Sequence, residues 1–219
     1  MRAKYIARLG GIAAVIAAAL LGLVPAWAQP RVFDPPGPGV ASAATADDTA
    51  PMTAMAAGPT LSRQLAQARL ATAKYATNLA RAKADGYQVI TPMMPDMGIH
   101  YMNPGIGGFT ITKPQILVYE HHGNTWQLGA LEWVFPKIPK TPPLPNATFG
   151  LFPAACHYAD GTFIPDKNSN TCPKTAPHTG AKFTFWHPDL TTMHVWVWYP
   201  NPAGLYSSTN PLVAPFNAG

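Results

Sequence analysis

Charged residues are scarce in this chain: Asp, Glu, Lys and Arg make up 11% of its 219 positions. It has no basic run interleaved with aromatic side chains, the usual mark of a nucleic-acid-binding surface. The chain also lacks G-x-S-x-G, H-E-x-x-H and C-x-x-C motifs and a glycine-rich phosphate loop. These absences argue against nucleic-acid partners and against the common hydrolase, zinc-protease, thiol-redox, nucleotide and flavin classes.

The first 28 residues have the layout of a secretory signal peptide. Basic residues come first, an apolar stretch covers 12–24, and Ala26-Trp27-Ala28 forms an A-x-A cleavage site. The apolar stretch is shorter than the roughly 20 residues that a membrane-spanning helix needs. We therefore expect cleavage after Ala28 and a secreted or periplasmic product without a stable membrane anchor.

Cysteine is limited to Cys156 and Cys172, which enclose 15 residues. In an exported protein, two cysteines at this spacing predict a disulfide. Closing a loop of this length would stabilise the fold by roughly 3 kcal/mol. Neither thiol would then be free for catalysis.

The remainder of the chain divides by composition. Residues 29–59 are rich in Pro, Ala and Gly and have too few large apolar side chains to offset their ordering entropy, which predicts a disordered tether. Residues 60–219 are expected to form a single domain. It should begin with a helix, because apolar and small residues recur at spacings of three and four from Leu61 to Ala82, with Thr60 as N-cap and Gly86 as the stop.

Beyond Gly86 the apolar period falls to two, and the 25 prolines and 18 glycines are typical of a turn-rich β protein. The turn His122–Thr125 is expected to join two strands as a hairpin. The predicted fold class is therefore α+β, with one N-terminal amphipathic helix packed on an antiparallel β-sheet or small β-barrel, and with Pro-rich loops. The strand candidates are 87–90, 115–121, 126–135, 182–186 and 193–199.

Ionisable side chains interrupt several of these apolar strands, where an isolated charge would cost several kcal/mol. The candidates are His100, Glu120, Glu132 and His194. Imidazoles and carboxylates converging from separate strands would suit a divalent transition metal such as zinc, copper or manganese. If a water occupied an open coordination position, the metal could activate it as a Lewis acid.

Hairpin geometry ranks these candidates. A tight turn near residue 124 places Glu120 opposite residue 127 or 128, and leaves Glu132 roughly 13 Å further along the strand. Both glutamates could then not bind one ion unless a bulge or strong twist intervened. We therefore rank His100, Glu132 and His194 as ligands above Glu120.

Three alternatives remain open from the residues alone. The cluster could be a structural polar network in a non-catalytic interaction protein that binds partners through loops 136–180. The methionines around His100 could bind Cu(I) through their thioethers; they are Met93, Met94, Met97 and Met102. Exposed tryptophan rings could stack on a carbohydrate; the candidates are Trp126, Trp133, Trp186 and Trp198.

Several fragments of the chain resemble a family of secreted bacterial proteins of unassigned function. They include M-G-x-H-Y-x-N-P at 97–104, Y-E at 119–120, L-E-W at 131–133 and H-V-W-V-W with N-P-x-G at 194–204. The resemblance implies a fold-sized unit from Leu61 to about Pro211, and it implies no particular reaction. The four candidate ligands lie within these fragments.

Overall fold

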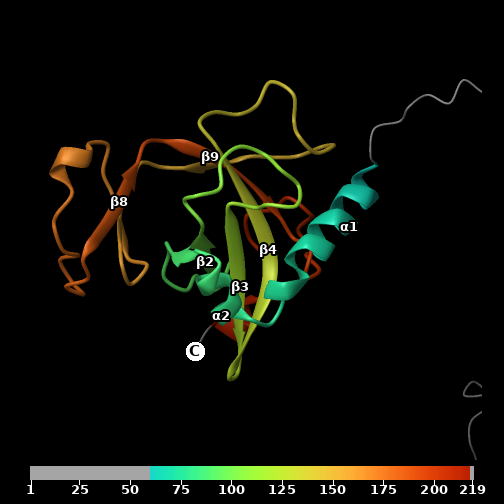
Figure 1. Cartoon of the computed structure of the whole chain (residues 1–219), viewed down its shortest axis with the longest axis horizontal. Coiled ribbons are helices and arrows are strands. Elements are labelled where there is room, and N and C mark those ends of the chain that lie inside the picture. The colour runs from blue at the N-terminus through green and yellow to red at the C-terminus, as the bar shows by residue number, and fades with distance from the viewer. Residues whose placement is uncertain (1–59, 218–219) are drawn as a thin grey trace, which may run out of the picture. The chain divides into compact units, whose positions relative to one another are not determined.

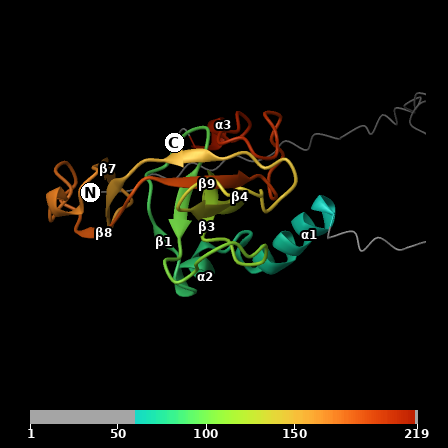
Figure 2. The same ribbon diagram turned by 90° about the horizontal axis from the view of Figure 1, so that it is seen from above.

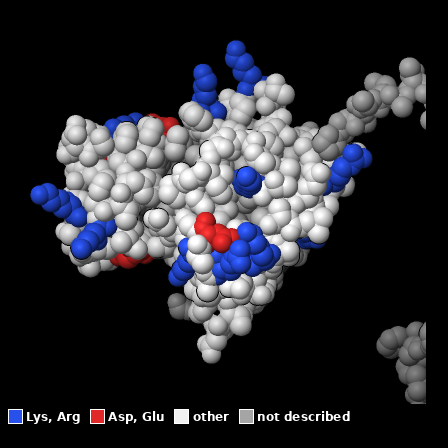
Figure 3. Space-filling view, in the orientation of Figure 1, with Lys and Arg blue, Asp and Glu red and all other residues white. Residues whose placement is uncertain are grey.

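The computed structural model describes residues 60–217, which all lie within one compact unit of the chain. The predicted signal peptide and tether lie outside the described residues. Within 60–217 no helix combines the length and the apolar character that crossing a bilayer requires. Figure 3 shows scattered Lys and Arg side chains and few acidic ones on the face in view, in keeping with the low charged fraction.

The largest element is an open antiparallel sheet of six strands (Figure 1). Its strands, in spatial order, are β1 (Gln88–Val89), β2 (Ile99–Met102), β3 (Ile116–His122), β4 (Thr125–Phe135), β9 (Leu190–Val195) and β5 (Gly150–Phe152). Because β1 and β5 form its two edges, the sheet is not closed. The sheet alternative of the fold prediction is therefore confirmed, and the barrel alternative is wrong.

The hairpin β3–β4 forms where the sequence predicted it, with His122 paired to Thr125 and Gly123 at a φ of 58°. Its ladder shifts by one residue between Val118 and Tyr119, which leaves Gly129 of β4 as the extra residue of a bulge. Beyond the bulge Glu120 pairs with Gln127, as hairpin geometry predicted.

A second antiparallel sheet has three strands in the order β7 (Phe163–Pro165), β6 (Ala155–Tyr158) and β8 (Phe183–His187). The Cys156–Cys172 disulfide is present, and joins β6 to the loop that follows the 3-10 turn η2 (Ser169–Thr171). Of these strands the sequence predicted β8 alone, to within a residue. The others have three or four residues, too few to show a period among the surrounding prolines.

The predicted helix begins at Leu61 but is not continuous. It divides into α1 (Leu61–Thr72), η1 (Ala73–Tyr75) and α2 (Leu79–Ala84), and a short α3 (Ala214–Asn217) lies near the C-terminus. The break coincides with bonds from the sheet, because the carbonyl of Tyr75 accepts from the Tyr119 hydroxyl and that of Ala76 from the Leu128 N–H. Asn78 then caps α2 by accepting from the Arg81 N–H. Contacts distant in sequence thus override a regular local period.

The main sheet has two buried faces. The face toward α1 and α2 (Figure 2) carries the larger apolar cluster, which includes Leu117, Leu131 and Trp133. The opposite face carries a smaller cluster that includes Ile116, Val118 and Ala130. Since successive residues of a strand point to opposite faces, the candidate ligands that pair with this second set lie away from the helices.

Gly98, at the end of the Met94–Gly98 turn, lies close against β3 and leaves no room for a side chain. At its φ of +102° a Cβ would lie 2.5 Å from the Tyr119 carbonyl oxygen, whereas Gly204, at +114°, has no atom within 4 Å of that position. Both alanine variants carry the cost of a positive φ, and only Gly98→Ala adds a collision. We expect Gly98→Ala to lower the free energy of unfolding by about 2 kcal/mol more than Gly204→Ala in urea titrations. Equal losses would contradict the tight approach.

Candidate metal centre

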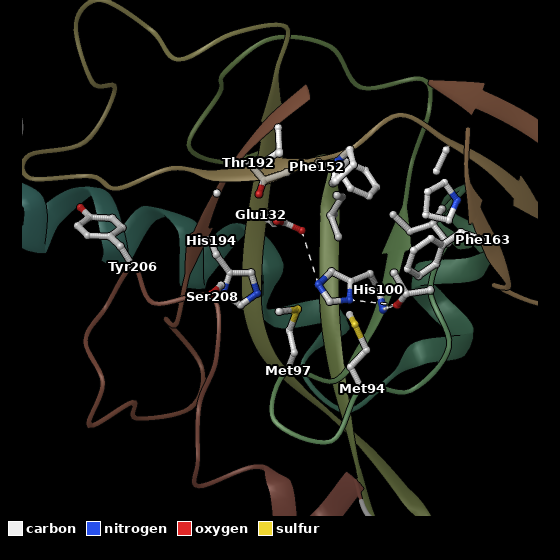
Figure 4. Close-up of a pocket in the computed structure, with 18 residues that line it drawn as sticks. Met94, Met97, His100, Glu132, Phe152, Phe163, Thr192, His194, Tyr206 and Ser208 are labelled. Atoms are coloured by element: carbon white, nitrogen blue, oxygen red, sulfur yellow. Dashed lines mark hydrogen bonds and ion pairs between the residues drawn. The ribbon is translucent and has the colours of Figure 1, made fainter. Parts of the chain in front are cut away.

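A cavity of about 380 Å³ lies on the face of the main sheet away from the helices. Most of its lining is apolar, from residues such as Ile90, Ile116 and Phe152. The exceptions include His100, Glu132 and His194, whose side chains face the same space from three different strands (Figure 4). The sheet therefore brings together the three residues that the sequence ranked first.

Strand pairing explains this convergence. Glu132 of β4 pairs with His194 of β9 on one side and with Ile116 of β3 on the other, and His100 of β2 pairs with Val118. Directly paired residues point to the same face, and so do residues two apart on one strand. Because Ile116 and Val118 are two apart, all three polar side chains lie on one face.

His194 presents an unpaired nitrogen to this cavity. Its Nδ1 lies 3.2 Å from the carbonyl oxygen of Ser207. A carbonyl only accepts, so Nδ1 carries the proton and Nε2 is left with a lone pair. Nε2 is buried and has no hydrogen-bond partner among residues 60–217. A buried acceptor without a partner is rare in folded proteins.

His100 is held by a single hydroxyl. Thr91 Oγ1 accepts from the His100 backbone N–H at 3.0 Å and lies 3.1 Å from the ring Nδ1. The other ring nitrogen, Nε2, is 3.7 Å from Glu132 Oε2, which is too long for a hydrogen bond. The rings of His100 and His194 have their centroids 6.1 Å apart.

The 3.7 Å separation of His100 Nε2 and Glu132 Oε2 is informative. Two ligands of a tetrahedral metal with bonds of about 2.0–2.1 Å stand roughly 3.3 Å apart. The pair therefore lies somewhat beyond the spacing of two ligands on one ion. The distance also exceeds that of a direct hydrogen bond.

Burial governs the charge of the three groups. It lowers the pKa of His100 to about 3, with a further contribution from His194, and the pKa of His194 to about 4. It raises the pKa of Glu132 to about 7, an effect that the Thr192 hydroxyl partly opposes. Both imidazoles are thus neutral at pH 7, so His100 and Glu132 do not form an ion pair. Neutral imidazole is the form that binds metals.

Glu120 is not part of this group. It is fully buried further along β3, where its Oε2 lies 3.0 Å from His122 Nε2. Its other oxygen occupies space that a Cβ at Gly129 would fill. The structure does not bring Glu120 to the cavity, and we drop it from the ligand set.

Two methionine side chains lie beside the imidazole rings of the cavity. Met94 and Met97 line the cavity, and Figure 4 shows their sulfur ends pointing toward the two imidazole rings. Met93 and Met102 are not among its lining residues. Thr91 and Thr192 also line the cavity. The sequence does not indicate them, because threonine is common in β-strands and does not by itself mark a functional site.

The described residues give little support to carbohydrate stacking. Trp133 and Trp196 are buried, and the other tryptophans of 60–217 are half-buried. No group of three or more His, Cys, Asp and Glu side chains within this range is close enough to form a complete metal site. A metal would therefore need a small closure of the cavity, thioether ligands, or both.

No protein-family model, no curated protein and no solved structure matches this chain. The family resemblance of its fragments thus remains a prediction.

The raised pKa of Glu132 predicts a pH-dependent difference between Glu132→Gln and the wild type. Between pH 4.5 and 7 the folded protein keeps a proton that the unfolded chain has lost, so the contribution of Glu132 to stability falls as pH rises. Glutamine does not titrate. We expect the stability of Glu132→Gln relative to the wild type to increase by about 3 kcal/mol from pH 4.5 to 8.

Urea unfolding across this pH range measures the difference, since the histidines titrate in both proteins and cancel. Asp96→Asn, at an exposed acidic residue, is the control. A pH-independent difference for Glu132→Gln would show that the carboxyl is ionised in the folded protein throughout.

Proposed function

We propose that this protein, exported by its signal peptide, binds one transition-metal ion in the cavity, and that the ion is Cu(I). His100 and His194 supply imidazole nitrogen, Met94 and Met97 supply thioether sulfur, and Glu132 is a further oxygen donor. The observation that carries the proposal is the buried Nε2 of His194, which directs a lone pair into the cavity without a partner among residues 60–217.

The orientation of His194 also supports the proposal. Histidine ligands usually donate their second ring N–H to a backbone carbonyl or a carboxylate, which fixes the tautomer and aims the free nitrogen. The Nδ1 contact to the Ser207 carbonyl is of this kind. On His100 the Thr91 hydroxyl can have the same role.

The choice of copper follows from the softness and the charge of the donors. Thioether and imidazole suit Cu(I), whereas manganese prefers carboxylates and water, and zinc sites seldom use methionine. The cavity wall is largely apolar, and its one carboxyl has a pKa of about 7. Such a site balances a single positive charge better than two.

The size of the cavity favours a second candidate function. An ion fills a small part of about 380 Å³, which leaves room for a water or a small molecule on the metal. A metal with an open position could activate that water, with Glu132 near its pKa as the acid–base partner. Azide added to the Cu(II)-loaded protein tests for the open position: a new charge-transfer band would support it, and an unchanged spectrum would argue against it.

Removal of the unpaired nitrogen tests metal binding directly. Residues 29–219 would be purified from the periplasm without a His-tag, and metal content measured by elemental mass spectrometry. We expect His194→Ala to lose one equivalent of bound copper relative to the wild type. His178→Ala, at an exposed histidine, should lose none.

If the wild type contains no metal and takes up none that is added, the cluster is structural. The chain would then fit the non-catalytic interaction protein with loops 136–180 as its binding face. Stoichiometric zinc or manganese in place of copper would retain the site but contradict the soft-donor assignment.

Replacing the two cavity methionines by leucine tests whether their sulfur atoms contribute to Cu(I) binding. Leucine has a similar volume and no sulfur, so Met94→Leu/Met97→Leu should preserve the fold. We expect it to weaken Cu(I) binding by about tenfold or more in competition with a colorimetric Cu(I) chelator. Met93→Leu, in the same segment but outside the cavity lining, is the control. Unchanged Cu(I) affinity would exclude the thioethers as ligands.

A further inference from the structure

A second pair of buried imidazoles lies in the three-stranded sheet. His157 of β6 and His187 of β8 face each other with their Nε2 atoms 3.0 Å apart. Each ring also contacts a backbone carbonyl through Nδ1: His157 that of Ile90 at 2.8 Å, and His187 that of Pro188 at 2.7 Å. Neither histidine lines the cavity described above.

The hydrogens of this pair do not satisfy its contacts. The pair makes three close contacts: one from each Nδ1 to a carbonyl oxygen, and one between the two Nε2 atoms. Each contact needs one hydrogen between the two atoms that it joins. Two neutral imidazoles supply two N–H groups, and both must lie on Nδ1 because carbonyl oxygens cannot donate. The two Nε2 lone pairs are then directed at each other at 3.0 Å. This arrangement is unfavourable unless a cation lies between them.

A shared proton is the alternative occupant of the space between the two Nε2 atoms. Burial lowers the pKa of His157 to about 4 and lowers that of His187 as well. The Ile90 and Pro188 carbonyls and Asp189 oppose these shifts only in part. Asp189 itself is directed elsewhere, since it accepts from the Ala154 N–H and lies 3.9 Å from Lys167.

Aromatic rings enclose the pair. Phe185 stacks on His157 with centroids 4.6 Å apart and planes within 5°, and Phe152 lies 4.1 Å from the His187 ring by the same measure. Phe163 stacks on His157 at 5.8 Å. Aromatic faces attract cations, but they are not metal ligands. Within residues 60–217 the two nitrogens are therefore the donors that this site offers.

We propose that His157 and His187 bind a soft monovalent cation, Cu(I), as a two-coordinate site between their Nε2 atoms. A closed-shell d¹⁰ ion of this kind accepts two nitrogen ligands, whereas Zn²⁺ prefers four. The Nδ1 contacts aim the ligating nitrogens, as they do at His194. Two metal–nitrogen bonds of about 2 Å in line would separate the Nε2 atoms to roughly 4 Å, so the rings move apart on binding.

This site is independent of the cavity, and a titration can separate the two. Ag(I), a redox-inert probe, and Cu(I) under anaerobic conditions would each be titrated into residues 29–219. We expect two equivalents in the wild type. His157→Ala and His187→Ala should each lose one equivalent and keep the one that depends on His194, while His178→Ala should keep both.

Other outcomes distinguish this proposal from the previous one. If the cavity does not bind metal, the wild type takes up one equivalent that His157→Ala abolishes and His194→Ala retains. A wild type that binds no more metal than His157→Ala would overturn the second site.

If the alanine variants do not fold, X-ray absorption on the metal in His194→Ala decides the question. The proposal requires two imidazole nitrogens and no sulfur around the ion. A sulfur ligand, or nitrogen NMR showing a proton on Nε2 of either His157 or His187 in the metal-free protein at neutral pH, would contradict it.

Discussion

The register of β4 between its two neighbours is the constraint on which the candidate site depends. Glu132 pairs with Ile116 on one side and with His194 on the other, so all three side chains point away from the helices. A slip of one residue would turn Glu132 into the cluster that packs on α1 and α2, and would bring Leu131 or Trp133 to the cavity. The bulge at Gly129 lies beyond this point and leaves the pairing of Glu132 intact.

Three buried histidines, one in the cavity and two in the three-stranded sheet, share one arrangement of hydrogen bonds. At His194, His157 and His187 the Nδ1 atom donates to a backbone carbonyl and the Nε2 atom is left as a buried acceptor. Burial keeps all three neutral at physiological pH, because an uncompensated positive charge would be costly in these apolar surroundings. Neutral nitrogen lone pairs held in fixed directions are what a soft metal ion needs.

A short segment connects the two sites. The carbonyl of Ile90 holds His157, and the hydroxyl of the next residue, Thr91, holds His100. The small sheet approaches this segment closely at Gly161, where a Cβ would lie 2.5 Å from the Thr91 carbonyl oxygen. The residues that contact His157 and His100 are thus consecutive in the chain.

Local patterns in the sequence determined the start of the helix, the β3–β4 hairpin, the separation of Glu120 from Glu132, and the identity of three residues that share the cavity. These features depend on neighbours along the chain, through turn chemistry, alternation and cysteine spacing. Tertiary structure alone decided the break in the helix, the short strands β5–β7, the cavity and the His157–His187 pair. The bonds that set them join residues far apart in sequence, as Tyr119 to Tyr75 and His157 to Ile90 show, and no local period records such contacts.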